Sequence, residues 1–107
     1  MNLETREAAG AVVVSLGGEV DLQHSPRLRK TLMDLMLEGR AVVVDMAAVA
    51  YIDSSGIASL VEAYQMARKN GTRFILAAVS EPARRVLQLA RLDRVFALAD
   101  TVEAALA

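Results

Sequence analysis

The residues best suited to chemistry stand together in the stretch 51–60, which reads YIDSSGIASL. The carboxylate of Asp53 is followed by two hydroxyls, Ser54 and Ser55, and then by Gly56. Polar side chains in the first turn of a helix cap free backbone N–H groups, and the same place attracts a phosphate. Two readings follow. In the first, Asp53 or Ser54 is only a helix cap and Gly56 only permits close packing. In the second, the small side chains leave an exposed hydroxyl accessible to the active site of another protein.

The rest of the chain offers little that an enzyme would need. His24, the only histidine, is far in sequence from both serines, and there is no cysteine. No G-x-S-x-G, Walker A or G-x-G-x-x-G pattern occurs, and the scattered carboxylates lack the spacing of metal ligands. We therefore expect a protein that is not an enzyme and holds no cofactor and no metal ion. His24 is expected to be a solvated loop residue.

The composition indicates one globular domain. The 107 residues are 54% hydrophobic, which favours a packed core over disorder. Twelve basic and thirteen acidic residues leave a net charge of −1, which gives no electrostatic footprint for nucleic acid or an anionic membrane. The absence of cysteine fits a reducing compartment. The N-terminus lacks a signal-peptide pattern, and no apolar run approaches the roughly 20 residues of a membrane span. We expect a cytoplasmic domain, by default a monomer.

The elements that must position the 51–60 stretch follow from hydrophobic periodicity. Apolar and β-branched runs predict five strands, at 2–7, 11–20 (ending near Gly17), 41–46, 73–79 and 94–98. Helical spacing predicts helices from Ser25 to Gly39, from the 51–60 stretch to Gly71, after Ser80, and after Asp100. The order β-β-α-β-α-β-α-β-α predicts an α/β domain with a mixed, mostly parallel central sheet.

Several side chains can be placed within these elements. Ser25, Ser80 and Asp100 are predicted helix caps. The side chains that we expect to face the core are Tyr51, Ile52, Ile57, Leu60, Val61, Tyr64, Val86, Leu89 and Ala90. The Asp53–Gly56 segment should lie at the carboxyl end of the central strand region, where sites gather in open α/β sheets.

Two segments together resemble a known family, the STAS domains, and within it the stand-alone bacterial anti-sigma factor antagonists. YIDSSGIASL before an amphipathic helix is similar to one hallmark of the family, and GGEVDLQHSPRLRKTL is similar to the other, a G-E-x-D turn that leads into the first helix. The likeness extends from about residue 3 to 106, and the order of strands and helices agrees. It implies that residues 1–107 form a single STAS domain.

The resemblance also implies a function. In the family, the serine directly after the aspartate is phosphorylated by an anti-sigma factor that is also a serine kinase of the histidine-kinase-like ATPase fold. The matching residue is Ser54. A PP2C-type serine phosphatase restores the unphosphorylated form, which binds the kinase and frees the sigma factor. The resemblance implies that the partner contacts Asp53, Ser54, Ser55, Gly56, Glu19 and Asp21.

Two other functions stay open at this point. Some domains of the family are accessory subunits bound to the ATPase of lipid-transporting ABC systems, where the serine matters less. The chain can also be an interaction domain that is never phosphorylated, with Ser54 acting only as a cap.

Overall fold

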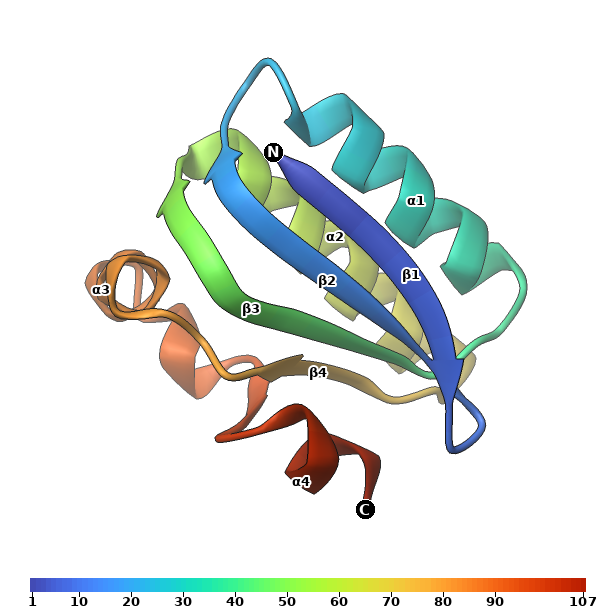
Figure 1. The fold of residues 1–107 in the computed structure, drawn as a ribbon. Coiled ribbons are helices and arrows are strands. Elements are labelled where there is room, and N and C mark those ends of the chain that lie inside the picture. Colours follow the sequence, from blue (N-terminus) through green and yellow to red (C-terminus); the bar gives the residue numbers. More distant parts are fainter.

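The computed structural model describes residues 1–107 and shows a five-stranded sheet in the order β1-β2-β3-β4-β5 (Figure 1). β1 is antiparallel to β2, and every other neighbouring pair is parallel. The bounds are β1 Asn2–Ala8, β2 Ala11–Val20, α1 Ser25–Leu37, β3 Val42–Ile52, α2 Ser54–Asn70, β4 Phe74–Ala77, α3 Glu81–Leu89, β5 Ala97–Ala99 and α4 Val102–Leu106. The predicted fold class and order of elements are confirmed. A 3₁₀ turn at Leu92–Arg94 was not expected.

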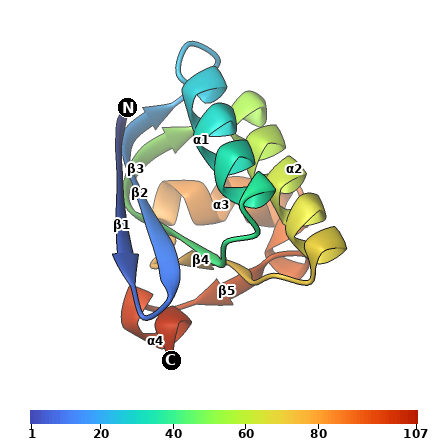
Figure 2. The same ribbon diagram turned by 90° about the vertical axis from the view of Figure 1, so that its right-hand side faces the viewer.

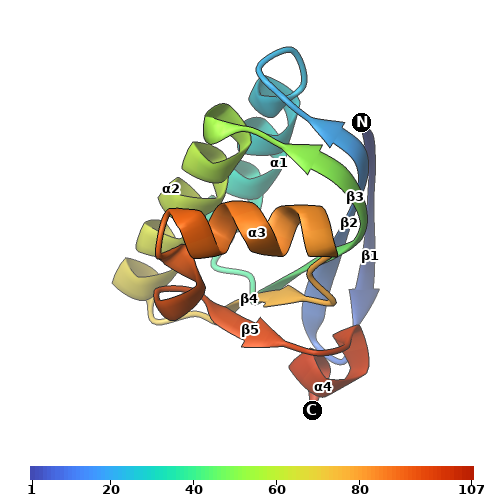
Figure 3. The same ribbon diagram turned by 90° about the vertical axis from the view of Figure 1, so that its left-hand side faces the viewer.

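The helices cover the sheet unequally. α1, α2 and α3 enclose the main core, and the short α4 lies against the opposite face (Figures 2 and 3). Successive valines of β2 and β3 pack into the two clusters in turn, because successive side chains of a strand point to opposite faces of the sheet. Val12 and Val14 belong to the main core, whereas Val13 belongs to the smaller cluster under α4. None of the helices combines the length and the apolar character that crossing a membrane requires.

β3 is longer than predicted, and β2 continues to Val20, past the glycines near which it was expected to end. These extensions position the site. β3 continues to Ile52, although Ala47, Ala48 and Ala50 weaken its strand pattern, because it stays paired with β2. The ladder shifts register between Ser15 and Gly17 and again after Gly18, which bends both strands toward the start of α2. The expected burial of Tyr51 is wrong: its side chain is 50% exposed at the end of the extended strand.

Two predicted caps are displaced by one residue. The N-cap of α1 is His24, and Ser25 is a buried helical residue. The N-cap of α4 is Thr101, whose hydroxyl accepts a hydrogen bond from the N–H of Ala104, so Asp100 lies outside the helix. The prediction for Ser80 is confirmed, since it caps α3 and also donates to the carbonyl of Val49 at 2.7 Å.

The C-terminal third contains two further errors. The last strand begins at Ala97, because residues 92–94 form the 3₁₀ turn instead of strand. In α3, Leu89 is 86% exposed and Ala90 is exposed, so neither faces the core. The buried residues are Ala83 and Leu87, which share one face of the helix.

Candidate functional site

The start of α2 is organised by the side chain of Asp53. Its Oδ1 accepts hydrogen bonds from the backbone N–H groups of Ser55 and Gly56, at 2.9 and 3.2 Å, and from the Ser55 hydroxyl. Asp53 is therefore the N-cap, in the extended conformation that this position requires. Of the two candidate caps that the sequence left open, the structure selects Asp53.

The two neighbouring serines are in different situations. The Ser55 hydroxyl is half-buried and donates to Asp53. Ser54, the first residue of α2, is exposed, and its hydroxyl makes no hydrogen bond within the protein. Of these two serines, only Ser54 has a hydroxyl that is exposed and free to contact another molecule.

Asp53 also joins α2 to the loop that follows β2. Its Oδ2 accepts a hydrogen bond from the N–H of Leu22 at 3.1 Å, and its own N–H donates to the carbonyl of Val20 at 3.2 Å. The Ser55 hydroxyl, helped by the N–H groups of Gly56, Ser55 and Leu22, lowers the pKa of Asp53 below its usual range. These donors keep Asp53 ionised and fix the loop beside the helix start.

Gly56 lets α2 begin close to the sheet. A Cβ at this position would lie 2.9 Å from Cγ1 of Ile52, from Cγ1 of Val20 and from the Val20 carbonyl oxygen. Gly56 is buried, so it faces the ends of β2 and β3 and presents no side to a partner. Close packing accounts for the glycine, as one reading of the sequence anticipated.

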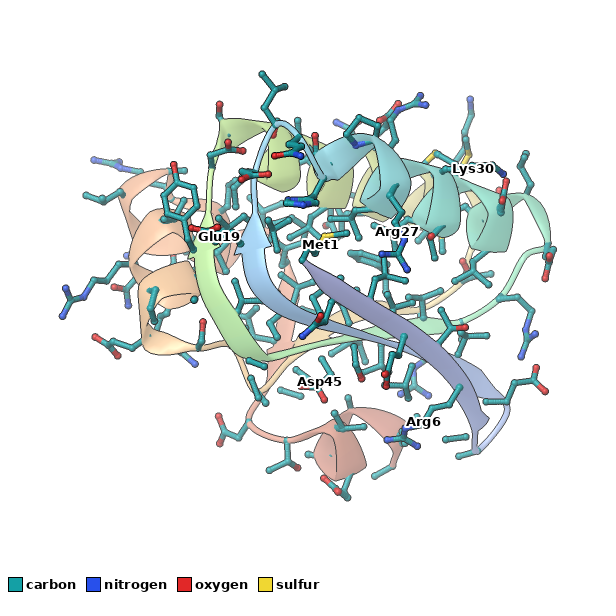
Figure 4. All side chains as sticks on the ribbon, turned by 45° about the horizontal axis from the view of Figure 1, so that its top comes forward. Met1, Arg6, Glu19, Arg27, Lys30 and Asp45 are labelled. Carbon is teal, nitrogen blue, oxygen red and sulfur yellow. The ribbon has the colours of Figure 1, made fainter.

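The remaining predicted site residues lie at the same corner. Glu19 is exposed and pairs with Tyr51 across β2 and β3 (Figure 4). Asp21 is half-buried, and its Oδ1 lies 2.7 Å from Nδ1 of His24. His24 is therefore held by Asp21 and is not simply a solvated loop residue. The carboxylates of Glu19, Asp21 and Asp53 thus belong to the end of β2, the loop after it and the start of α2, which the Leu22–Asp53 hydrogen bond joins.

Two exposed apolar side chains flank these acids. Leu22 is 74% exposed, and Tyr51 is 50% exposed. Sequence reasoning did not single out Leu22, although a leucine in the polar turn VDLQHSP, outside any periodic pattern, is a usable signal. The hydrogen bond to Asp53 holds the backbone of Leu22 in place although its side chain faces solvent.

The hollows in the surface of the protein lie away from this corner. The three hollows in the surface measure about 340–420 Å³, and none is lined by residues 19–24 or 51–56. No hydrogen bond joins His24 to Ser54, and no group of three His, Cys, Asp or Glu is close enough to hold a metal ion. An exposed hydroxyl at a helix start that is not recessed can instead enter the active site of another protein.

Known proteins resemble this chain in sequence and in fold. The STAS domain family model matches residues 2–105. The anti-sigma-F factor antagonist RsfB of Mycobacterium tuberculosis is 30% identical over 98 residues, covering 91% of this chain and 80% of that protein. The anti-sigma-B factor antagonist of Bacillus subtilis is 27% identical over 83% of this chain and 82% of its own length. A crystal structure of an anti-sigma factor antagonist from Mycobacterium paratuberculosis superposes with a TM-score of 0.89 at 30% identity, over 98% of this chain and 90% of that chain.

Proposed function

This chain belongs to the STAS domain family, and we propose that it is an anti-sigma factor antagonist switched by phosphorylation of Ser54. In this proposal the unphosphorylated chain binds an anti-sigma factor that is also a serine kinase of the histidine-kinase-like ATPase fold. Binding releases the sigma factor. The kinase transfers the terminal phosphate of ATP to the Ser54 oxygen, and a PP2C-type serine phosphatase removes it. The chain is then a substrate and not a catalyst, and the cytoplasm, where ATP is available, is the expected compartment.

One observation carries this proposal: the Ser54 hydroxyl is exposed and unbonded at the first residue of α2. Its neighbour Ser55 is tied to Asp53, so the two hydroxyls are not equivalent acceptors. Because Asp53 already caps the helix, Ser54 is not needed as a cap. The fold therefore gives this serine no structural task that phosphorylation would disturb.

The physical chemistry of the corner suits a binding switch. A phosphate adds about −1.5 to −2 charges at neutral pH, and the positive end of the α2 dipole favours that charge at Ser54. The fold should therefore tolerate it. A partner docked over Glu19, Asp21 and Asp53 would meet added bulk and the cost of removing water from the phosphate charge. A loss of about 2.8 kcal/mol in binding free energy already weakens an interface roughly 100-fold.

Leu22 and Tyr51 give the proposed contact surface apolar area that a partner can bury. Both side chains are exposed, and apolar or aromatic anchors surrounded by polar groups are typical of protein interfaces. In the proposed contact surface, Asp53, Ser54, Ser55, Glu19 and Asp21 add polar groups. Gly56 contributes indirectly, by keeping the start of α2 against the sheet.

The proposal is tested by incubating the chain with a serine-kinase anti-sigma factor and ATP, then mapping phosphate by mass spectrometry. One phosphate at Ser54 is expected, and Ser54→Ala should abolish it. Ser55→Ala is the matched control, because it alters the adjacent hydroxyl and should still be modified. Ser54→Asp should leave the circular dichroism spectrum unchanged. Phosphate on Ser55, or modification that survives Ser54→Ala, would refute the assignment.

A further inference from the structure

The outer edge of β1 presents backbone groups in a defined pattern, and no strand pairs with them. Ala8 and Ala11 flank a two-residue hairpin turn, so they form a hydrogen-bonded pair. Hydrogen-bonded and non-hydrogen-bonded pairs alternate along an antiparallel ladder. The next pair, Glu7 with Val12, is therefore not hydrogen-bonded, and the backbone N–H and C=O groups of the two residues point away from each other. The N–H of Val12 does donate to Ala41 on the opposite side, as this alternation requires.

The same alternation continues along the strand. The N–H and C=O groups of Leu3, Thr5 and Glu7 all point outward from the sheet. Arg27 of α1 donates a long hydrogen bond, 3.4 Å, to the outward carbonyl of Leu3, which agrees with this assignment. β1 is the terminal strand of the sheet, and no strand covers this edge (Figure 2).

Two side chains of opposite charge lie at equal distances from the centre of β1. Glu4 and Arg6 lie on either side of Thr5, both are exposed, and neither forms an ion pair within the protein. They share one face of the strand, whereas Leu3, Thr5 and Glu7 share the other. Thr5 and Glu7 are also exposed, and the Glu7 carboxylate forms an ion pair with Arg40, which follows α1.

We propose that β1 is a self-association edge, which pairs antiparallel with β1 of a second copy of this chain about a two-fold axis at Thr5. In this register, Thr5 faces Thr5 of the second copy and all seven residues of the strand overlap. Each Glu4 lies opposite an Arg6 in a non-hydrogen-bonded pair, where side chains approach most closely. The outward N–H and C=O groups of Leu3 meet those of Glu7 of the second copy, and the Leu3 carbonyl exchanges its long hydrogen bond from Arg27 for one from the Glu7 N–H.

The charges select this register over its neighbours. The outward N–H and C=O groups of the two copies must face each other in any register. The alternative registers therefore move the two-fold axis from Thr5 to a neighbouring residue, one residue at a time. Centring on Glu4 places two glutamates opposite each other, and centring on Arg6 places two arginines opposite each other. Charged residues on an edge often prevent pairing with foreign strands, and here the same charges favour one specific partner.

The association has a structural consequence for the molecule. A two-fold axis at Thr5 extends the sheet across two copies and leaves the start of α2, which follows β3, away from the junction. Each dimer therefore carries two Ser54 corners, both free. This inference does not depend on the proposed phosphorylation, and it replaces the default expectation of a monomer.

The test is the solution mass of the full chain over a range of concentrations, by sedimentation equilibrium. The wild type should shift from monomer to dimer as its concentration rises. Glu4→Arg alone and Arg6→Glu alone should each weaken dimerisation about tenfold or more, because two like-charged pairs replace two opposite pairs. Mixing these two variants should restore dimers that contain one copy of each, and the double variant should form homodimers again.

Lys69→Glu is the matched control for Arg6→Glu, since it makes the same charge change on an exposed residue at the far end of α2 and should leave the dimer intact. Circular dichroism checks that each variant is folded. A wild type that stays monomeric at every concentration overturns the proposal. So does a dimer that is indifferent to the reversals at Glu4 and Arg6, which would indicate association through another surface, such as the exposed Leu37 or Leu89.

Discussion

Replacing Gly56 by alanine should disturb the helix start without adding charge. The new Cβ would lie 2.9 Å from Ile52, from the Val20 side chain and from the Val20 carbonyl oxygen. Neither neighbour can easily yield, because Val20 is 0% and Ile52 2% exposed. The Val20 carbonyl also accepts the hydrogen bond of the Asp53 N–H, so moving it loosens the capped turn.

The size of the effect follows from two opposing contributions. Overpacking a buried site by one methyl group costs about 1–3 kcal/mol. Alanine has a better helix propensity than glycine by up to about 1 kcal/mol, and less than that in a first turn. The free energy of unfolding should therefore fall by about 1–2 kcal/mol. At roughly 4–8 °C per kcal/mol for a domain near this size, the Tm should fall by about 4–16 °C.

Thermal unfolding followed by circular dichroism measures this shift. Ser54→Ala is the control, because it changes the same turn at an exposed position and should alter stability by no more than about 0.5 kcal/mol. The amide resonance of Leu22 gives a second readout, since Leu22 donates to Asp53. If Gly56→Ala is as stable as the wild type, with the Leu22 resonance unmoved, the close approach of α2 to the sheet is not the reason for the glycine.

Three further predictions concern Asp53, Ser80 and Leu22. Asp53→Asn should lower the free energy of unfolding at neutral pH, because folding lowers the pKa of Asp53. The difference in stability between wild type and variant should persist above the unfolded-state pKa of about 3.9 and disappear as the pH falls through the lower folded-state pKa. Urea unfolding at a series of pH values measures it. Ser80→Ala removes a helix cap and a hydrogen bond to Val49, and calorimetry should find a loss of about 1–2 kcal/mol. Leu22→Ser should leave the Tm nearly unchanged but weaken binding of the kinase by about tenfold in titration calorimetry; unchanged affinity would remove Leu22 from the interface.

Local sequence patterns were sufficient for most of the framework. Runs such as AVVVSL and AVVVDM mark buried central strands because β-branched residues pack well on both faces of a sheet. Gly71 was correctly expected to end α2, and it adopts the left-handed conformation that glycine favours. Caps were less certain, because adjacent polar residues compete for the position, as Thr101 does with Asp100.

The errors arise where distant parts of the chain decide the local structure. The end of β3 follows its pairing with β2, which no local run of residues encodes, and this pairing carries Tyr51 to the surface. The hydrogen bond between Leu22 and Asp53 joins residues 31 apart in sequence. The hydrophobicity of Leu89 predicts an inward side chain, but α3 buries only Ala83 and Leu87 before it ends. Which serine stays free depended on the orientation of Asp53, which is a tertiary property.

The most direct test of the switch compares the affinity of the anti-sigma kinase for the unmodified chain and for the chain phosphorylated at Ser54. Titration calorimetry with a non-hydrolysable ATP analogue prevents further transfer during the measurement. The account predicts at least a 100-fold weaker complex after phosphorylation, with an unchanged Tm for the modified domain. Equal affinities for the two forms, or unfolding of the phosphorylated chain, would contradict it.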